Sequence, residues 1–244
     1  MLYVLLITSF IMHYLAFSCA IKKTYSINNF SRSKQLLSKF IGRMASTTSD
    51  EKIKGILEFY LPVNEQGIKD SGACFKLWFA KNLEFDQTLR NRFVGDWQVA
   101  MNGGYADWEN TSKGSLALVV LLDQFSRNMF RGNAGSFSSD PKALLVTKNA
   151  ISRGLDMELT PIERMLLYMP LMHSESFEDH ENFSIPKFSE LVAADSSLSF
   201  AATYEKKHAD IIRQWGRYPH RNAILGREST PEEIEFLKTE GSSF

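Results

Sequence analysis

Residues 115–132 read SLALVVLLDQFSRNMFRG, and this stretch decides how the rest of the chain must fold. After Ser115, its first half is apolar on every side of a helix. A helix that is apolar all round lies in the centre of a domain, where other helices cover it. The β-branched pair Val119-Val120 also occurs in strands, but the length of the run and its continuing helical spacing favour a helix. The stretch therefore predicts a buried central helix.

Helical spacing continues on both sides of this stretch. Apolar residues recur at intervals of three and four in residues 52–61, 73–82, 84–102 and 201–215, and no run alternates with a period of two. Asp140-Pro141 predicts a helix capped by Asp140 and ending near Gly154. Capping boxes are expected at Thr160 and Thr230, while Pro170 should end or kink the helix that begins at Thr160. We expect an all-α domain with roughly eight to ten helices.

The N-terminal residues have a different composition. Residues 1–20 are apolar and uncharged and end in small residues, which is typical of a signal peptide or signal anchor. Residues 21–49 are basic and contain no acid, as in a transit peptide or linker. Together they predict a route through the secretory pathway to a plastid. Translation from Met44 would instead give a cytoplasmic protein, and in either case the helical domain is expected over residues 50–244.

Charge and cysteine content exclude several classes of function. The chain has 28 basic and 28 acidic residues. Six of the basic residues precede Asp50, which is the first acidic residue, so the helical domain has 22 basic and 28 acidic residues. The helical domain is therefore acidic, and we expect no nucleic-acid partner because phosphate binding needs a basic surface. No membrane contact is expected for the mature domain. Cys74 is the single cysteine of the domain, so it forms no disulfide there and belongs to no cysteine-rich zinc site.

Three polar motifs interrupt the apolar helices. Asp123, Arg127 and Arg131 follow one another at intervals of four and share a face of the central helix. A second motif, with His173 and Glu175, follows Pro170. A third, GRYPHRNAILGR at 216–227, is dense in hydrogen-bond donors. Buried charges need partners, so we expect the motifs to meet, with Asp123 and Glu175 as partners of the arginines. They would form either a structural clasp or a ligand pocket.

The three motifs together resemble an uncharacterised family that is common in bacteria and is known as a domain of unknown function. The resemblance runs over about residues 53–238 and rests on DQFSRNMFRG (123–132), MPLMHSE (169–175) and GRYPHRNAILGRESTPEE (216–233). It implies a tetratricopeptide-like (TPR-like) array of antiparallel helices, and it brings no known activity. Ser126, Tyr218 and His180 depart from the family pattern, but none of them removes a titratable group. The implied pocket residues are Asp123, Gln124, Arg127, Asn128, Arg131, His173, Ser174, Glu175, Arg217, His220, Arg221, Asn222 and Arg227.

Two functions follow from these residues. In the first, five arginines face two nearby carboxylates, so spare guanidinium groups bind an anionic small molecule and a histidine supplies acid–base chemistry. In the second, the domain is a TPR-like module that binds a protein partner, and the polar cluster is a structural clasp. No motif selects an enzyme reaction or a cofactor, and no metal site is expected. The catalytic candidates are His173, Glu175, His220 and Asp123, and the ligand-binding candidates are Arg127, Asn128, Arg131, Arg217, Arg221, Asn222 and Arg227.

Overall fold

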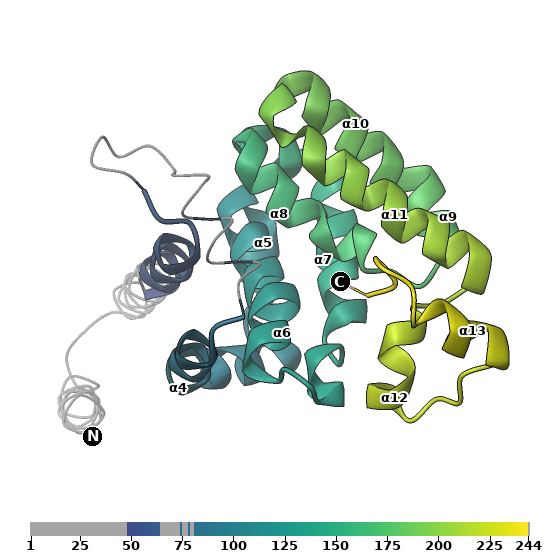
Figure 1. Ribbon diagram of the computed structural model, residues 1–244. Coiled ribbons are helices and arrows are strands. Elements are labelled where there is room, and N and C mark those ends of the chain that lie inside the picture. Colours follow the sequence, from purple (N-terminus) through teal and green to yellow (C-terminus); the bar gives the residue numbers. More distant parts are fainter. Residues whose placement is uncertain (1–47, 64–73, 75–77, 79–80, 244) are drawn as a thin grey trace, which may run out of the picture. The chain divides into compact units, whose positions relative to one another are not determined.

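The computed structural model describes residues 48–63, 74, 78 and 81–243 (Figure 1). The chain divides into two compact units, Met1–Glu51 and Lys52–Phe244. The signal and transit segments expected before residue 48, and the alternative start at Met44, lie outside the described residues and stay predictions. Within the described part, no helix is both long and apolar enough to cross a membrane.

The second unit is all-helical in its described residues, which confirms the predicted fold class. Residues 48–60 are helical. The later α-helices are α4 (Leu83–Met101), α5 (Ser112–Val119), α6 (Ser126–Met129), α7 (Asp140–Ser152), α8 (Pro161–Met172), α9 (Phe177–Asp179), α10 (Ile185–Ala194), α11 (Ser199–Trp215), α12 (Asn222–Leu225) and α13 (Pro231–Phe236). Two π-helical segments, η2 (Val120–Phe125) and η5 (His180–Ser184), join α5 to α6 and α9 to α10. The helices range from 3 to 19 residues, and a TPR-like arrangement stays a prediction.

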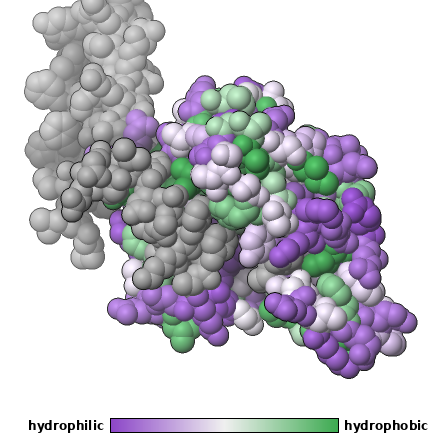
Figure 2. Space-filling view, turned by 45° about the horizontal axis from the view of Figure 1, so that its top comes forward, coloured by the Kyte–Doolittle hydropathy of each residue, from purple (hydrophilic) through white to green (hydrophobic). Residues whose placement is uncertain are grey.

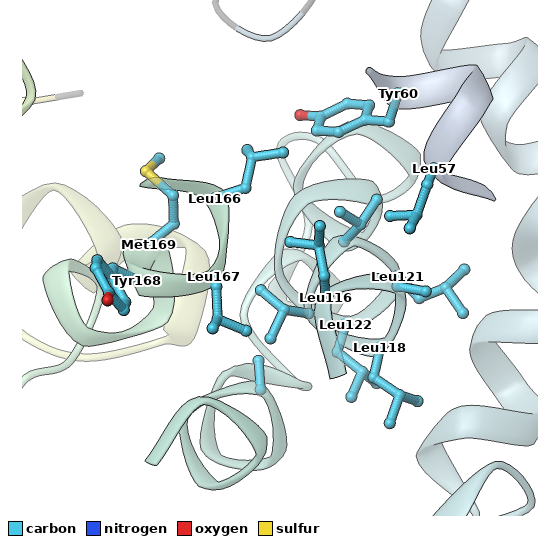
Figure 3. Close-up of a cluster of buried hydrophobic side chains, with 14 of the residues drawn as sticks. Leu57, Tyr60, Leu116, Leu118, Leu121, Leu122, Leu166, Leu167, Tyr168 and Met169 are labelled. Carbon is cyan, nitrogen blue, oxygen red and sulfur yellow. The ribbon is translucent and has the colours of Figure 1, made fainter. Parts of the chain in front are cut away.

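The predicted central helix is confirmed. It runs without a break through α5, η2 and α6, and all its residues from Gly114 to Ser126 are buried. Helices α4, α7 and α8 pack against it. Figure 3 shows Leu166 and Leu167 of α8 beside the leucines of the central helix. The wide turn at η2 was not predicted; π-helical turns are rare and often occur at functional sites.

Aromatic residues complete the main core beside the central helix. Tyr60 stacks on Trp78, with ring centroids 5.6 Å apart, and meets Phe125 edge-to-face at 5.2 Å. The indole nitrogen of Trp78 donates to the carbonyl of Tyr60 at 2.9 Å. A second, smaller apolar cluster joins the end of α11 to α13. There the ring centroids of Trp215 and Phe236 lie 5.4 Å apart. On the surface, polar and apolar residues are interspersed over the described face of Figure 2.

Most of the expected helix signals are confirmed, and two need correction. The capping boxes at Thr160 and Thr230 are both present, and Gly154 adopts the left-handed conformation with φ +70°. Asp140 was expected as an N-cap, but the cap position is Ser139 and α7 begins at Asp140. Helix α8 does not end at Pro170 but continues to Met172, because a proline in the last turn removes one backbone hydrogen bond of a helix that ends two residues later; a kink at Pro170, the other alternative, stays a prediction.

Candidate functional site

A cavity of about 790 Å³ brings parts of all three polar motifs together. Its wall comes from the end of the central helix, from α8 and α11, and from the turn before α12. Of the predicted site residues, Gln124, Arg127, Asn128, Arg131, His173, His220 and Arg221 line it. The other lining residues are Trp78, Gly132, Ser136, Phe137, Met165, Met169, Met172, Phe200, Ala201, Tyr204, His208, Ile224 and Ser243.

Asp123 and His173 form a buried pair at this wall. His173 is the C-cap of α8, and its Nδ1 lies 2.8 Å from Oδ1 of Asp123, whose side chain is fully buried. Burial would raise the pKa of Asp123, but Arg127 and then His173 hold it well below its usual range. Burial, followed by the Arg127 charge, lowers the pKa of His173. The imidazole is therefore neutral and donates from Nδ1 to the carboxylate, which leaves Nε2 as an acceptor.

Arg127 is held by two carboxylates. Its Nη1 lies 2.9 Å from Oδ1 of Asp123, as the spacing of four predicts. The same guanidinium makes two hydrogen bonds of 2.9 Å to Asp140, one to each carboxylate oxygen. This second pairing explains why Asp140 does not cap α7: its side chain turns toward the central helix instead.

Arg131 is also fully paired. Its Nε and Nη2 donate to the two oxygens of Asp86 in α4, at 2.7 and 3.0 Å. Asn128 donates to the same carboxylate at 2.8 Å. The guanidinium group of Arg131 therefore links the central helix to α4.

Three other candidates form a clasp outside the cavity wall. Arg217 donates through Nε and Nη2 to both oxygens of Glu233 at 2.7 and 2.8 Å, and the hydrogen bond to Arg217 is the main cause that lowers the pKa of Glu233 to about 2. Asn222 donates to the same carboxylate at 3.2 Å. Arg227 donates to both oxygens of Glu175 at 2.6 and 3.0 Å. These contacts tie the 216–227 motif to α13 and to the end of α8.

The pairing of Arg227 with Glu175 confirms that Glu175 is a partner of one of the arginines. Glu175 is not among the residues that line the cavity. Glu175 also accepts a hydrogen bond from the backbone nitrogen of Tyr218 at 2.9 Å. Burial would raise the pKa of Glu175, but its hydrogen bond to Arg227 and the one from Tyr218 lower it. The carboxylate is thus engaged on both oxygens by structural donors.

Arg221 is the exception among the five arginines. Its side chain is 7% exposed, and its one ion pair is a long contact of 3.4 Å from Nη1 to Asp140, which already binds Arg127 on both oxygens. Nε of Arg221 is buried without a hydrogen-bond partner among the described residues, as is Nε of Arg227, but Arg227 binds both oxygens of Glu175 through its other two nitrogens and Arg221 has no such carboxylate. The guanidinium lies 4.4 Å from the ring centroid of Tyr218 and 4.7 Å from that of Phe137. Burial, followed by the charge of Arg127, lowers its pKa. The guanidinium group of Arg221 is therefore buried and held in place between two rings. It lines the cavity, and some of its hydrogen-bond donors are not in use.

Two more histidines line the cavity. His208 of α11 lies with its ring centroid 6.2 Å from that of His173, and its Nδ1 is 2.8 Å from the carbonyl of Tyr204. Burial lowers the pKa of His208 well below its usual value. Burial, with Arg221 as the next cause, lowers the pKa of His220 to about 4. All three cavity histidines are therefore neutral near pH 7.

Several site residues were missed by sequence reasoning. Asp86 and Asp140 hold the arginines, Phe137 supports Arg221, and His208 lines the cavity. One signal for His208 was available: it occupies the buried face of the amphipathic helix α11, where apolar residues are the rule. Among the described residues, no three His, Cys, Asp or Glu side chains are placed to hold a metal ion.

Comparison with known proteins places the chain in a family. Residues 56–241 match the family model described as "Bacterial protein of unknown function (DUF924)". A solved structure, that of a protein of unknown function, ATU0120, from Agrobacterium tumefaciens, is 31% identical with a TM-score of 0.68, and the match covers 78% of this chain and 98% of that one. No curated protein matches. The chain thus belongs to the DUF924 family, for which these comparisons indicate no specific function.

Proposed function

We propose that the cavity binds a small anionic molecule and that Arg221 is its anchor. The observation that supports this is the contrast between Arg221 and the other four arginines. Arg127, Arg131, Arg217 and Arg227 each donate two hydrogen bonds to one carboxylate, whereas Arg221 has one long contact to a carboxylate already in use. A buried cation with unused donors is costly. An anion that enters the cavity would satisfy it.

The two interpretations of the polar cluster apply to different residues. The clasp is supported for Arg217, Asn222 and Arg227, whose partners lie in the last turns of the chain and at the end of α8. The pocket is supported for Arg221 and His173, which line the cavity. We therefore propose a smaller ligand-binding set than the sequence predicted, with Arg127 and Arg131 as supports rather than ligands.

His173 gives this site a capacity for acid–base chemistry. Its Nδ1 is held by Asp123 at 2.8 Å, which fixes the orientation of the ring. Nε2 is the ring nitrogen that does not contact Asp123, and it belongs to a side chain of the cavity wall. A neutral imidazole oriented by a carboxylate is the arrangement of a general base. In a catalysed reaction, His173 would accept the proton and Asp123 would act as its positioning residue.

Thermal unfolding in the presence of small anions tests the anchor. Acetate, phosphate and sulfate would each be added to the full chain, to Arg221→Met and to a matched control, Arg213→Met, whose arginine is exposed on α11. An anion at ten times its Kd stabilises by about 1.4 kcal/mol, which raises Tm by roughly 3–6 °C for a domain of this size. We expect at least one anion to stabilise the wild type and the control but not Arg221→Met. Equal stabilisation of all three proteins would refute the proposal.

A TPR-like module that binds a protein partner is the second candidate. The four paired arginines favour it, because they show that charges in these motifs can serve structure alone. In that case no small anion should stabilise the protein in the same experiment.

A further inference from the structure

The cavity has an apolar wall that an inorganic anion would not use. On α8, Met165, Met169 and Met172 recur at intervals of four and three, so they lie on one face of the helix. Seven residues of helix cover about 10 Å, and His173 follows directly. The methionine wall therefore leads along α8 to the polar end of the cavity.

Helix α11 repeats this arrangement. Ala201, Tyr204 and His208 recur at intervals of three and four, and all three line the cavity. His208 lies beside His173, with ring centroids 6.2 Å apart. Two helices thus each present apolar or aromatic side chains followed by a histidine, and their histidines meet.

The volume and the charges of the cavity restrict the size and the charge of a possible ligand. About 790 Å³ is the size of a pocket for a drug-sized organic molecule. Arg127, Arg131 and Arg221 at its wall are balanced by the carboxylates that they contact, which are Asp86, Asp123 and Asp140. With neutral histidines the site has no net charge, so a ligand with one negative charge is easier to accommodate than a dianion.

We infer that the ligand is a monocarboxylate with an apolar body, bound with its carboxylate at Arg221 and its body along the methionine wall. This inference rests on the proposed function of the same cavity. The guanidinium fork matches the geometry of a carboxylate. The thioether side chains of Met165, Met169 and Met172 adapt to apolar bodies of different shape, so the wall selects for hydrophobicity more than for one outline.

Calorimetric titration of the full chain with acetate, hexanoate, octanoate and octanamide tests the inference. Burial of each methylene should tighten binding about fourfold, so octanoate should bind about 15-fold more tightly than hexanoate. Octanamide, which has the same chain without the charge, should bind at least about tenfold more weakly than octanoate. Acetate should bind most weakly of the three carboxylates.

A variant of the wall separates the body of the ligand from its head. Met169→Gln keeps the length of the side chain but makes it polar, so it should weaken octanoate several-fold and leave acetate within about twofold. Met157→Gln is the matched control, because Met157 is exposed outside the cavity. Circular dichroism checks that each variant is folded, and Met172→Gln replaces Met169→Gln where the latter does not fold.

The outcomes distinguish the two proposals. If octanoate and acetate bind equally well and both lose affinity in Arg221→Met, the apolar body is irrelevant; this inference is overturned and the proposed function stands. If octanoate and octanamide bind equally well and Arg221→Met changes neither, the anion anchor is wrong and both fall. Absence of binding by all four probes overturns this inference, and the thermal unfolding experiment with phosphate and sulfate then decides the proposed function by itself.

Discussion

Replacement of Arg221 by methionine should change the free energy of unfolding very little, although the Arg221 side chain is only 7% exposed. The substitution removes two cation–π contacts, to Tyr218 and Phe137, each worth about 1 kcal/mol. It also removes a buried Nε–H without a partner, whose desolvation costs about 1–3 kcal/mol. The thioether can still pack against both rings. We therefore expect a stability within about 1 kcal/mol of the wild type.

Arg127→Met provides the contrast. This substitution leaves Asp123, which is fully buried, without its guanidinium partner. Loss of one partner of a buried pair costs about 3–5 kcal/mol, and the lower value applies because His173 and Gln124 still contact the carboxylate. About 3 kcal/mol corresponds to a fall in Tm of roughly 6–12 °C for a domain of this size.

Urea denaturation followed by tryptophan fluorescence and by far-UV circular dichroism measures both variants. Coincident transitions establish two-state unfolding, so the two free energies can be compared. If Arg221→Met loses as much stability as Arg127→Met, Arg221 is a structural group like the other four arginines, and the reasoning about unused donors is refuted.

Three further predictions concern pH, charge and capping. Because the pKa of His220 is lowered from 6.5 to about 4, the unfolded chain binds protons more readily than the folded chain; stability should fall as pH falls from 6.5 to 4, by up to about 3 kcal/mol. Urea titrations of the wild type and His220→Phe over this range check it, and an unchanged slope in the variant would contradict it. Asp140→Asn removes the carboxylate that competes for Arg221, so calorimetry should show octanoate binding about tenfold more tightly; weaker binding would count against the anchor. Thr230→Ala should cost about 1 kcal/mol in urea denaturation, because Thr230 accepts from Glu233 in the capping box of α13, and an unchanged stability would show that this cap contributes nothing.

The elements that sequence predicted well are those set by local chemistry. The apolar run around Leu116–Leu122 had to be buried, and the capping residues Thr160 and Thr230 act within three residues of their own position. The pairing of Asp123 with Arg127 followed from one helical turn. The all-helical fold needed nothing beyond these local signals.

The partners of the remaining arginines could not be predicted in the same way. Asp86 is 45 residues from Arg131, and Asp140 is 81 residues from Arg221. No spacing rule connects residues that far apart. In the sequence, the five arginines have two carboxylates near them in the motifs. In the folded domain, three further carboxylates contact these arginines: Asp86, Asp140 and Glu233. Of the five arginines, Arg221 is therefore the one without a carboxylate that it binds through two nitrogens.

The apolar wall of the cavity could not be predicted from the sequence either. Met165, Met169 and Met172 have the spacing of ordinary core residues, and spacing does not tell whether a face is filled or lines a space. His173 was placed correctly at the end of a helix, but α8 passed through Pro170 instead of ending there. The local rule for proline was sound in principle and had little effect in the last turn.

The most direct test of the anion anchor is the nuclear magnetic resonance signal of the Arg221 Nε–H group, assigned by its loss in Arg221→Met, during a titration with octanoate. We predict that this signal shifts with the Kd found by calorimetry, while the Nε–H signal of Arg217 in the clasp stays in place. An Arg221 signal that does not move while octanoate binds would contradict the central claim, because the anion would then be held elsewhere.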